Sequence, residues 1–177
     1  MSVLYIFITV LRVFVFGMAM VAGILIMLGP GVCYVIKKNP STIECDGTAS
    51  ISILDWNTMG YGVYGQIVIF TVPLILSVKP LYYVLYYSLY KVWPCWIQQL
   101  ITLSYVSIIF AGCGAIEVWM ILRYGAIGFW NQMNVTTFIQ GWASAGGLYF
   151  GCSILLLIDS VVMFCYRTKK QDECTIV

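Results

Sequence analysis

Histidine is absent from the 177-residue chain, and charged residues make up only 9% of it. Without histidine, the sequence lacks the side chain that most often serves as a general base or a metal ligand near neutral pH. Hydrophobic residues make up 62% of the chain, which is more than a soluble core of this size can bury. The composition therefore excludes a soluble enzyme, a disordered segment and a nucleic-acid-binding module. The net charge of +2 is too small to indicate an electrostatic partner.

Four long stretches carry no charged side chain: residues 13–36, 59–78, 92–116 and 124–158. A helix that crosses a bilayer needs about 20 apolar residues, and these stretches are continuous, unlike the alternating strands of a membrane barrel. We predict an all-α fold, an integral membrane four-helix bundle that forms a single domain over 1–177. The helices are expected at about 5–36, 59–78, 93–122 and 141–166, followed by a short cytoplasmic tail over 167–177.

The distribution of lysine and arginine indicates the orientation, because cytoplasmic loops carry the excess of these residues. If both termini are cytoplasmic, the inner side holds six of the nine basic residues: Arg12, Lys79, Lys91, Arg167, Lys169 and Lys170. The sequon Asn134-Val135-Thr136 lies in the loop that this orientation places outside, so Asn134 is a candidate for N-glycosylation. We therefore predict that both termini are cytoplasmic.

The seven cysteines differ in their expected depth. Cys33 and Cys45 fall at the outer end of the first helix and in the first outer loop, where they either form a disulfide or remain thiols. Cys95, Cys165 and Cys174 lie near the inner face, where cysteines are either palmitoylated or remain free. The chain has no C-x-x-C motif and no catalytic or cofactor-binding constellation, so we expect no metal, no cofactor and no enzymatic activity.

Three ionisable residues, Arg12, Glu117 and Asp159, fall inside the predicted helices. A charge in the bilayer costs roughly 2.5–3.5 kcal/mol on insertion scales, so each needs a partner or water. Arg12 and Asp159 have similar depth, and we predict that they form an ion pair or that a hydrogen bond neutralises Asp159. Glu117 either extends outward or contacts a polar residue such as Gln66. The alternative is a proton or ion path through the three residues, but the broken helices and repeats of transporters are not visible.

Small residues and the end of the chain suggest two kinds of contact. Gly147 and Gly151 form a G-x-x-x-G pattern, which permits close helix packing inside the bundle or lateral contact with another membrane protein, including a second copy. The sequence ends Thr175-Ile176-Val177, a pattern that fits capture of the carboxyl terminus by a PDZ scaffold.

Four spans, two modest outer loops and cytoplasmic termini are typical of claudin-like and MARVEL-like proteins, although the Gly-Leu-Trp and paired cysteines of the claudin loop are absent. Four motifs resemble the Snakeskin-type proteins of arthropod smooth septate junctions: IFITVLR at 6–12, GPG at 29–31, WN at 56–57 and LLLIDSVV at 155–162. The first outer loop, which is acidic and carries a cysteine, and the tail are both longer than expected of that family.

The resemblance implies a structural role in the plasma membrane at lateral contacts between epithelial cells. It also implies two partners, a Mesh-like protein and a tetraspanin, in addition to the lipid bilayer. We therefore expect a junction component that contributes to the paracellular barrier and to junction assembly. Two alternatives stay open: a MARVEL-like trafficking or lipid-organising protein, and an accessory subunit of a channel or transporter.

Overall fold

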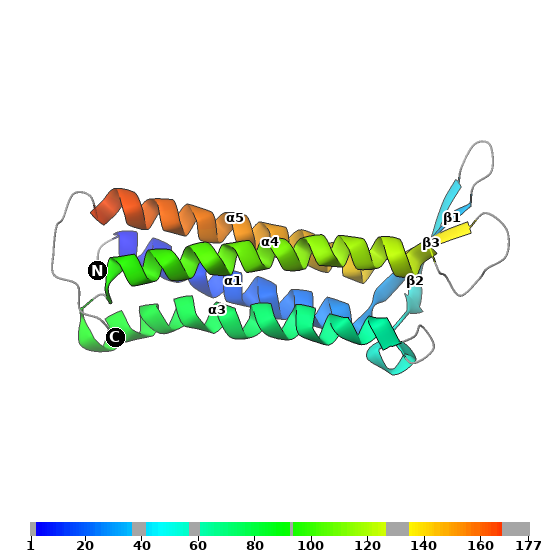
Figure 1. The fold of residues 1–177 in the computed structure, drawn as a ribbon, viewed down its shortest axis with the longest axis horizontal. Helices are drawn as coiled ribbons and strands as arrows, with labels where there is room; N and C mark the ends of the chain where they lie inside the picture. Colours follow the sequence, from blue (N-terminus) through cyan, green and yellow to red (C-terminus); the bar gives the residue numbers. More distant parts are fainter. Residues whose placement is uncertain (1–2, 37–41, 57–60, 93, 127–134, 168–177) are drawn as a thin grey trace.

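In the computed structural model, four long helices lie side by side and a small sheet lies at one end of the bundle, which we call the sheet end (Figure 1). The structure describes residues 3–36, 42–56, 61–92, 94–126 and 135–167. The helices are α1 (Val3–Leu28), α3 (Gly65–Tyr90), α4 (Trp96–Ala126) and α5 (Gln140–Arg167). Each helix packs against the next one in the chain, and α1 also packs against α5, so the helices form a closed ring.

All four helices are long and apolar enough to cross a membrane. The candidate spans are Val3–Leu28, Gly62–Tyr90, Trp96–Leu122 and Gln140–Cys165. At 1.5 Å per residue the helices are about 39–46 Å long, whereas a hydrocarbon core is about 30 Å thick. The prediction of four long apolar helices packed as a bundle is confirmed. Each helix is a candidate membrane span that is long enough to extend beyond the core.

Helix α1 ends at Leu28 instead of continuing to residue 36 as predicted. Gly29 and Gly31 have φ angles of 49° and 74°, a left-handed conformation that favours glycine, and Pro30 between them cannot donate a helical hydrogen bond. The chain therefore leaves the helix at this point and continues as strand β1 (Pro30–Ile36). The apolar side chains of this strand explain why it looked like more helix in the sequence.

Helix α3 covers residues 65–90, whereas the prediction was 59–78. A short 3-10 helix, η2 (Tyr61–Tyr64), precedes it, and the helix continues through Lys79 and Pro80. It ends where Lys91 adopts a left-handed conformation and its N–H donates a hydrogen bond of 2.9 Å to the carbonyl oxygen of Tyr87. Helices α4 and α5 begin and end within a few residues of their predicted ranges.

A three-stranded antiparallel sheet joins the two loops at the sheet end, with the strand order β2–β1–β3. The central strand β1 pairs on one edge with β2 (Thr42–Ser50) and on the other edge with β3 (Val135–Ile139). The all-α prediction is wrong here, since the fold is mostly helical with a small sheet. Strand β3 has the sequence VTTFI, and such β-branched and aromatic residues favour strands.

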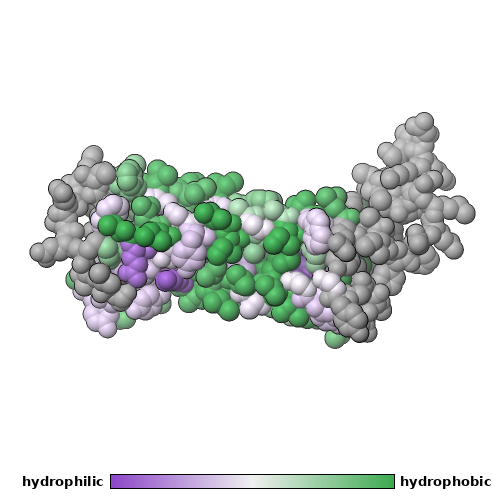
Figure 2. All heavy atoms as spheres, viewed as in Figure 1, coloured by the Kyte–Doolittle hydropathy of each residue, from purple (hydrophilic) through white to green (hydrophobic). Residues whose placement is uncertain are grey.

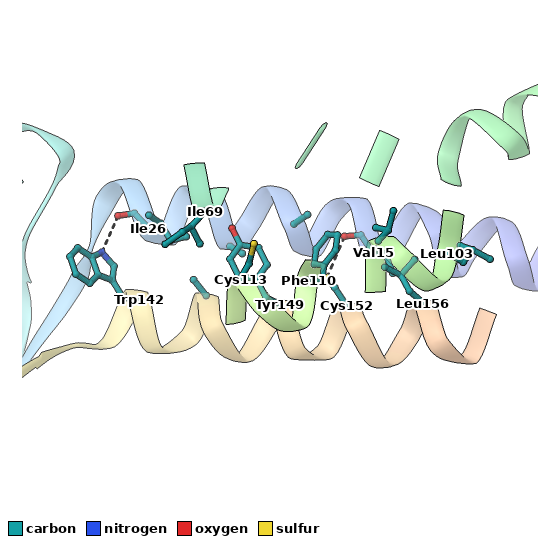
Figure 3. Packing of buried hydrophobic residues seen from close by; sticks show 14 of the residues in the cluster. Val15, Ile26, Ile69, Leu103, Phe110, Cys113, Trp142, Tyr149, Cys152 and Leu156 are labelled. Carbon is teal, nitrogen blue, oxygen red and sulfur yellow. Dashed lines mark hydrogen bonds between the residues drawn. The ribbon is translucent and has the colours of Figure 1, made fainter. Parts of the chain in front are cut away.

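Side chains from all four helices fill the interior of the bundle. Figure 3 shows aromatic and aliphatic side chains along its length, including Val15 of α1, Phe110 of α4 and Tyr149 of α5. The outside is also apolar: many large hydrophobic side chains are exposed on every helix. On the face shown in Figure 2, hydrophobic surface covers much of the bundle, and hydrophilic residues gather toward the end opposite the sheet. An apolar exterior along the helices is what a lipid environment requires.

Candidate functional site

A disulfide between Cys33 and Cys45 holds strands β1 and β2 together. These two cysteines face each other in the register of the sheet. On the other side, the Gln140 Nε2 atom, at the first residue of α5, donates a hydrogen bond of 2.9 Å to the Cys33 sulfur. Of the two alternatives left by the sequence, the structure contains the disulfide. The hydrogen bond from Gln140 then links the bonded strands to helix α5.

The exposed strand β2 contains a bulge opposite β1. Pro30 and Val32 of β1 pair with Ser50 and Asp46 of β2, so the register between the two strands shifts at this point. Within this bulge the Asp46 carboxylate accepts hydrogen bonds from the backbone N–H of Thr48 at 2.9 Å and from its hydroxyl at 2.6 Å. These bonds, the side-chain one first, hold the pKa of Asp46 below its usual value. A bulge and a charged side chain on an edge strand hinder its pairing with strands of other molecules.

Two buried tryptophans connect the sheet end to the bundle. The Trp142 indole N–H donates a hydrogen bond of 3.1 Å to the carbonyl oxygen of Ile26, as Figure 3 shows. Trp56, from the first loop, packs edge-to-face on Trp142 with ring centroids 6.4 Å apart. Next to Trp142, Gly141 lies so close to Pro30 that a Cβ would collide with it. The first loop is therefore fixed on the ends of α1 and α5.

The ion pair predicted between Arg12 and Asp159 is present, and the charged cluster around it includes all four helices. Arg12 Nε lies 2.7 Å from Asp159 Oδ2, with both side chains fully buried. The Arg12 guanidinium also donates to Gln99 Oε1 on α4 and to the carbonyl oxygen of Pro80 on α3, each at 3.3 Å. Gln99 donates in turn to the carbonyl oxygen of Pro94 at 3.0 Å. We did not predict the role of Gln99, although an amide inside an apolar helix is a signal that could have revealed it.

Glu117 takes the second of its predicted positions, in contact with Gln66. The Gln66 Nε2 atom of α3 donates a hydrogen bond of 3.1 Å to Glu117 Oε1 of α4, and both side chains are 0% exposed. Among the described residues, Glu117 Oε2 has no hydrogen-bond partner. This carboxyl group faces the interior between α3, α4 and α5, because its Cβ and Cγ atoms lie against the backbone position of Gly146.

Further polar contacts link neighbouring helices along the bundle. The hydroxyl groups of Ser107 and Ser153 are 3.0 Å apart across α4 and α5, and those of Tyr83 and Thr102 are 3.0 Å apart across α3 and α4. In lipid, where apolar surfaces gain little from association, such contacts and close packing hold helices together. The polar residues of the bundle interior thus act as cross-links between helices.

The two glycines of the G-x-x-x-G pattern have different surroundings. Gly151 faces α1, since an added Cβ would lie 3.0 Å from the Met18 methyl group. Gly147 is exposed, and an added Cβ would have nothing within 4 Å. The close packing of α5 instead involves Gly141 and Gly146, of which the latter faces Glu117. The pattern therefore has one glycine at a helix contact and one on the outer surface.

The cysteines expected near the inner face also differ. Cys95 is buried at the start of α4 and is disulfide-bonded, so it is not available for palmitoylation. Cys165 is exposed near the end of α5 and stays a candidate. Asn134, Cys174 and the residues Thr175, Ile176 and Val177 lie outside the described residues, so their predictions stay as they are.

Comparisons with protein-family models, with curated proteins and with solved structures gave no match. Within the ranges that the structure describes, no group of three or more Cys, Asp or Glu side chains is placed to hold a metal ion. The sites of this chain are therefore described by their own geometry: a disulfide-bonded sheet at one end and buried polar contacts along the bundle.

Proposed function

We propose that this protein is a structural, non-enzymatic component of an epithelial cell–cell junction of the smooth septate type, where it contributes to the paracellular barrier and to junction assembly. The observation that supports the proposal is the sheet, in which strands from both loops form one unit. The disulfide and the contacts of Gln140 and Trp56 fix this unit to the bundle. A small surface held rigidly on a membrane bundle suits the presentation of a fixed contact to other proteins.

The proposed orientation places the sheet outside the cell and both termini in the cytosol. The bias of basic residues and the sequon at Asn134 favour this orientation. The Cys33–Cys45 disulfide also fits an oxidising exterior. Disulfides alone do not distinguish the two faces, because Cys95 at the opposite end is also disulfide-bonded. The orientation therefore rests on charge and on the sequon.

The size of the sheet indicates that adhesion would need a larger partner. A standard protein–protein interface involves roughly 20–30 residues on each side. The three strands have 7, 9 and 5 residues, and because alternate side chains point to opposite faces, one face of the sheet presents about half of them. The proposed role is therefore that of an organiser, which holds a Mesh-like protein and a tetraspanin as the resemblance to Snakeskin-type proteins implies. The same proposal includes two further contacts. A PDZ scaffold would bind the carboxyl-terminal residues Thr175, Ile176 and Val177, and the protein would associate with a second copy of itself.

The test is localisation and barrier function in a polarised epithelium. We expect tagged protein at lateral contacts, and we expect its depletion to raise paracellular tracer flux. A matched variant, Cys33→Ser with Cys45→Ser, should reach the surface but restore the barrier poorly. Residence mainly on intracellular vesicles would contradict the junction proposal and support the MARVEL-like trafficking alternative.

The channel or transporter alternative is retained because one carboxyl oxygen of each buried acid, Glu117 Oε2 and Asp159 Oδ1, has no hydrogen-bond partner among the described residues. An intramembrane carboxyl group with spare capacity is a common feature of ion and proton paths. A flux assay with Glu117→Gln and Asp159→Asn decides this alternative. Unchanged permeation in both variants would end it.

A further inference from the structure

Lys79 differs from the three buried charged side chains of the described helices. Arg12, Glu117 and Asp159 are buried and have polar partners from other helices. Lys79 is exposed on the outer surface of α3, and no carboxylate of the described residues pairs with it. An unpaired cation on a surface that faces lipid is costly, so the surroundings must supply an anion or water.

The depth of Lys79 can be estimated along α3. Its neighbour Pro80 contacts Arg12, so Lys79 lies at the level of the buried ion pair. A hydrocarbon core of about 30 Å beginning at Gly65 would end after about 20 residues, near position 85. Lys79 would then lie about 9 Å inside the core. From this depth the flexible lysine side chain can bring its charge toward the headgroups.

The contacts of Lys79 place its amine at the boundary between two helices. Its Nζ atom lies 5.9 Å from the centroid of the Tyr105 ring on α4, a cation–π contact across the α3–α4 boundary. Figure 1 shows these two helices next to each other along the bundle. Exposed apolar side chains share the helical stripe of Lys79 on α3 and that of Tyr105 on α4: Ile75, Ile101 and Ile108.

Phenol groups continue from Lys79 toward the end of α3 opposite the sheet. Tyr82, Tyr86 and Tyr90 follow at four-residue spacing, with ring centroids 6.2 Å and 4.7 Å apart. Tyr82 and Tyr90 are exposed. Tyrosines of this kind lie at the level of lipid headgroups, where the ring is in the apolar region and the hydroxyl can donate to polar groups.

We propose that the α3–α4 boundary at Lys79 binds an anionic phospholipid, with the ammonium group and the Tyr82 hydroxyl facing its headgroup and the apolar stripes facing its acyl chains. Charge complementarity favours this occupant, since basic sites between membrane helices on the cytoplasmic side attract anionic headgroups. The assignment to the cytoplasmic leaflet rests on the orientation proposed above. The proposed contact between Lys79 and an anionic lipid does not depend on that orientation.

The test uses the full chain in nanodiscs that contain the same lipids in both leaflets, so its result is independent of orientation. Spin-labelled phosphatidylserine and phosphatidylcholine report the relative association of each lipid with the protein surface. We expect the wild-type protein to prefer phosphatidylserine, and Lys79→Gln to lower this preference roughly fivefold. Lys79→Arg should keep it. Lys91→Gln is the matched control at the end of the same helix and should lower it less.

Equal association of both lipids with the wild-type protein would overturn the proposal and leave an acidic partner helix as the explanation for Lys79. Full preference retained in Lys79→Gln would overturn it as well. If Lys79→Gln does not yield folded protein, the wild-type salt dependence decides. A preference that falls at high salt supports an ionic contact, and one that does not change contradicts it. Absence of the protein from cell junctions would refute the proposed function but leave this result unaffected.

Discussion

The two buried carboxyl groups, Asp159 and Glu117, occupy opposite halves of the bundle and have different partners. Asp159 meets a cation that also contacts Gln99 and Pro80, so one charged cluster includes all four helices. In the part of the chain that the structure describes, Glu117 has a single hydrogen-bond partner, the neutral amide of Gln66. In this bundle, a buried ion pair whose partners come from every helix links all four of them, whereas a carboxyl group with one neutral partner adds a single link between two helices.

The largest expected effect is the loss of one member of the ion pair. Asp159→Ala leaves the Arg12 cation buried and unpaired, which should lower the free energy of unfolding by about 3–5 kcal/mol. Arg12→Met combined with Asp159→Leu should cost less than either single change, because no unpaired charge remains. Unfolding by SDS in mixed micelles, followed by circular dichroism, measures all three. A double variant as unstable as the single ones would show that the pairing does not matter.

Removal of the disulfide is expected to act on the sheet and to leave the bundle folded. Cys33→Ser with Cys45→Ser opens a loop with a sequence separation of 12, and disulfides closing such loops typically contribute about 2–4 kcal/mol. Protease digestion should therefore become faster in the first loop, while the helical circular dichroism signal stays the same. Loss of the helical signal would contradict the separation of sheet and bundle.

Two glycines of α5 provide a matched pair. Gly141→Ala places a Cβ against Pro30 and 2.9 Å from the carbonyl oxygen of Leu25, so it should cost about 1–3 kcal/mol through overpacking. Gly147→Ala meets open space and should be neutral or stabilising by up to about 1 kcal/mol. Thermal unfolding in detergent compares them. A destabilising Gly147→Ala with reduced self-association would instead show that this glycine lies at a contact between molecules.

The smallest effect is expected at Glu117. Glu117→Gln preserves the shape of the side chain and an acceptor for Gln66, so the change in unfolding free energy should stay below about 1 kcal/mol. Gln66→Leu removes the only described partner of a buried carboxyl group and should cost about 1–3 kcal/mol. The same SDS titration ranks the two. If Glu117→Gln is the more damaging change, the negative charge has a role that the comparison with Asp159 does not explain.

Hydropathy and charge were sufficient to predict the four helices and the Arg12–Asp159 pair, because lipid requires long apolar helices and buried charges need partners. They were insufficient to predict the sheet. Strand β1 packs Val32 and Cys33 into the interior, which requires apolar side chains there. Its sequence, PGVCYVI, is therefore as apolar as that of the helix before it. The left-handed conformation of Gly29 and Gly31 marks the boundary, but glycines are also common inside membrane helices.

The contact between Glu117 and Gln66 was one of two sequence-based alternatives, since depth alone does not determine which way a side chain near a helix end turns. Gln99 was missed because its role depends on the order of helices around the ring. The sequence marks Gln99 as an unusual amide in an apolar helix, but it does not show that α4 comes close enough to α1 for Gln99 to contact Arg12.

The most direct test of the account is the accessibility of the two ends of the bundle in living cells. Leu54 at the sheet end and Ser88 near the opposite end of α3 are both exposed, and each can be replaced by cysteine. A membrane-impermeant maleimide should label Leu54→Cys in intact cells above the background of the unsubstituted protein. Ser88→Cys should react only after the cells are permeabilised. Labelling of Ser88→Cys in intact cells, with Leu54→Cys protected, would contradict the account.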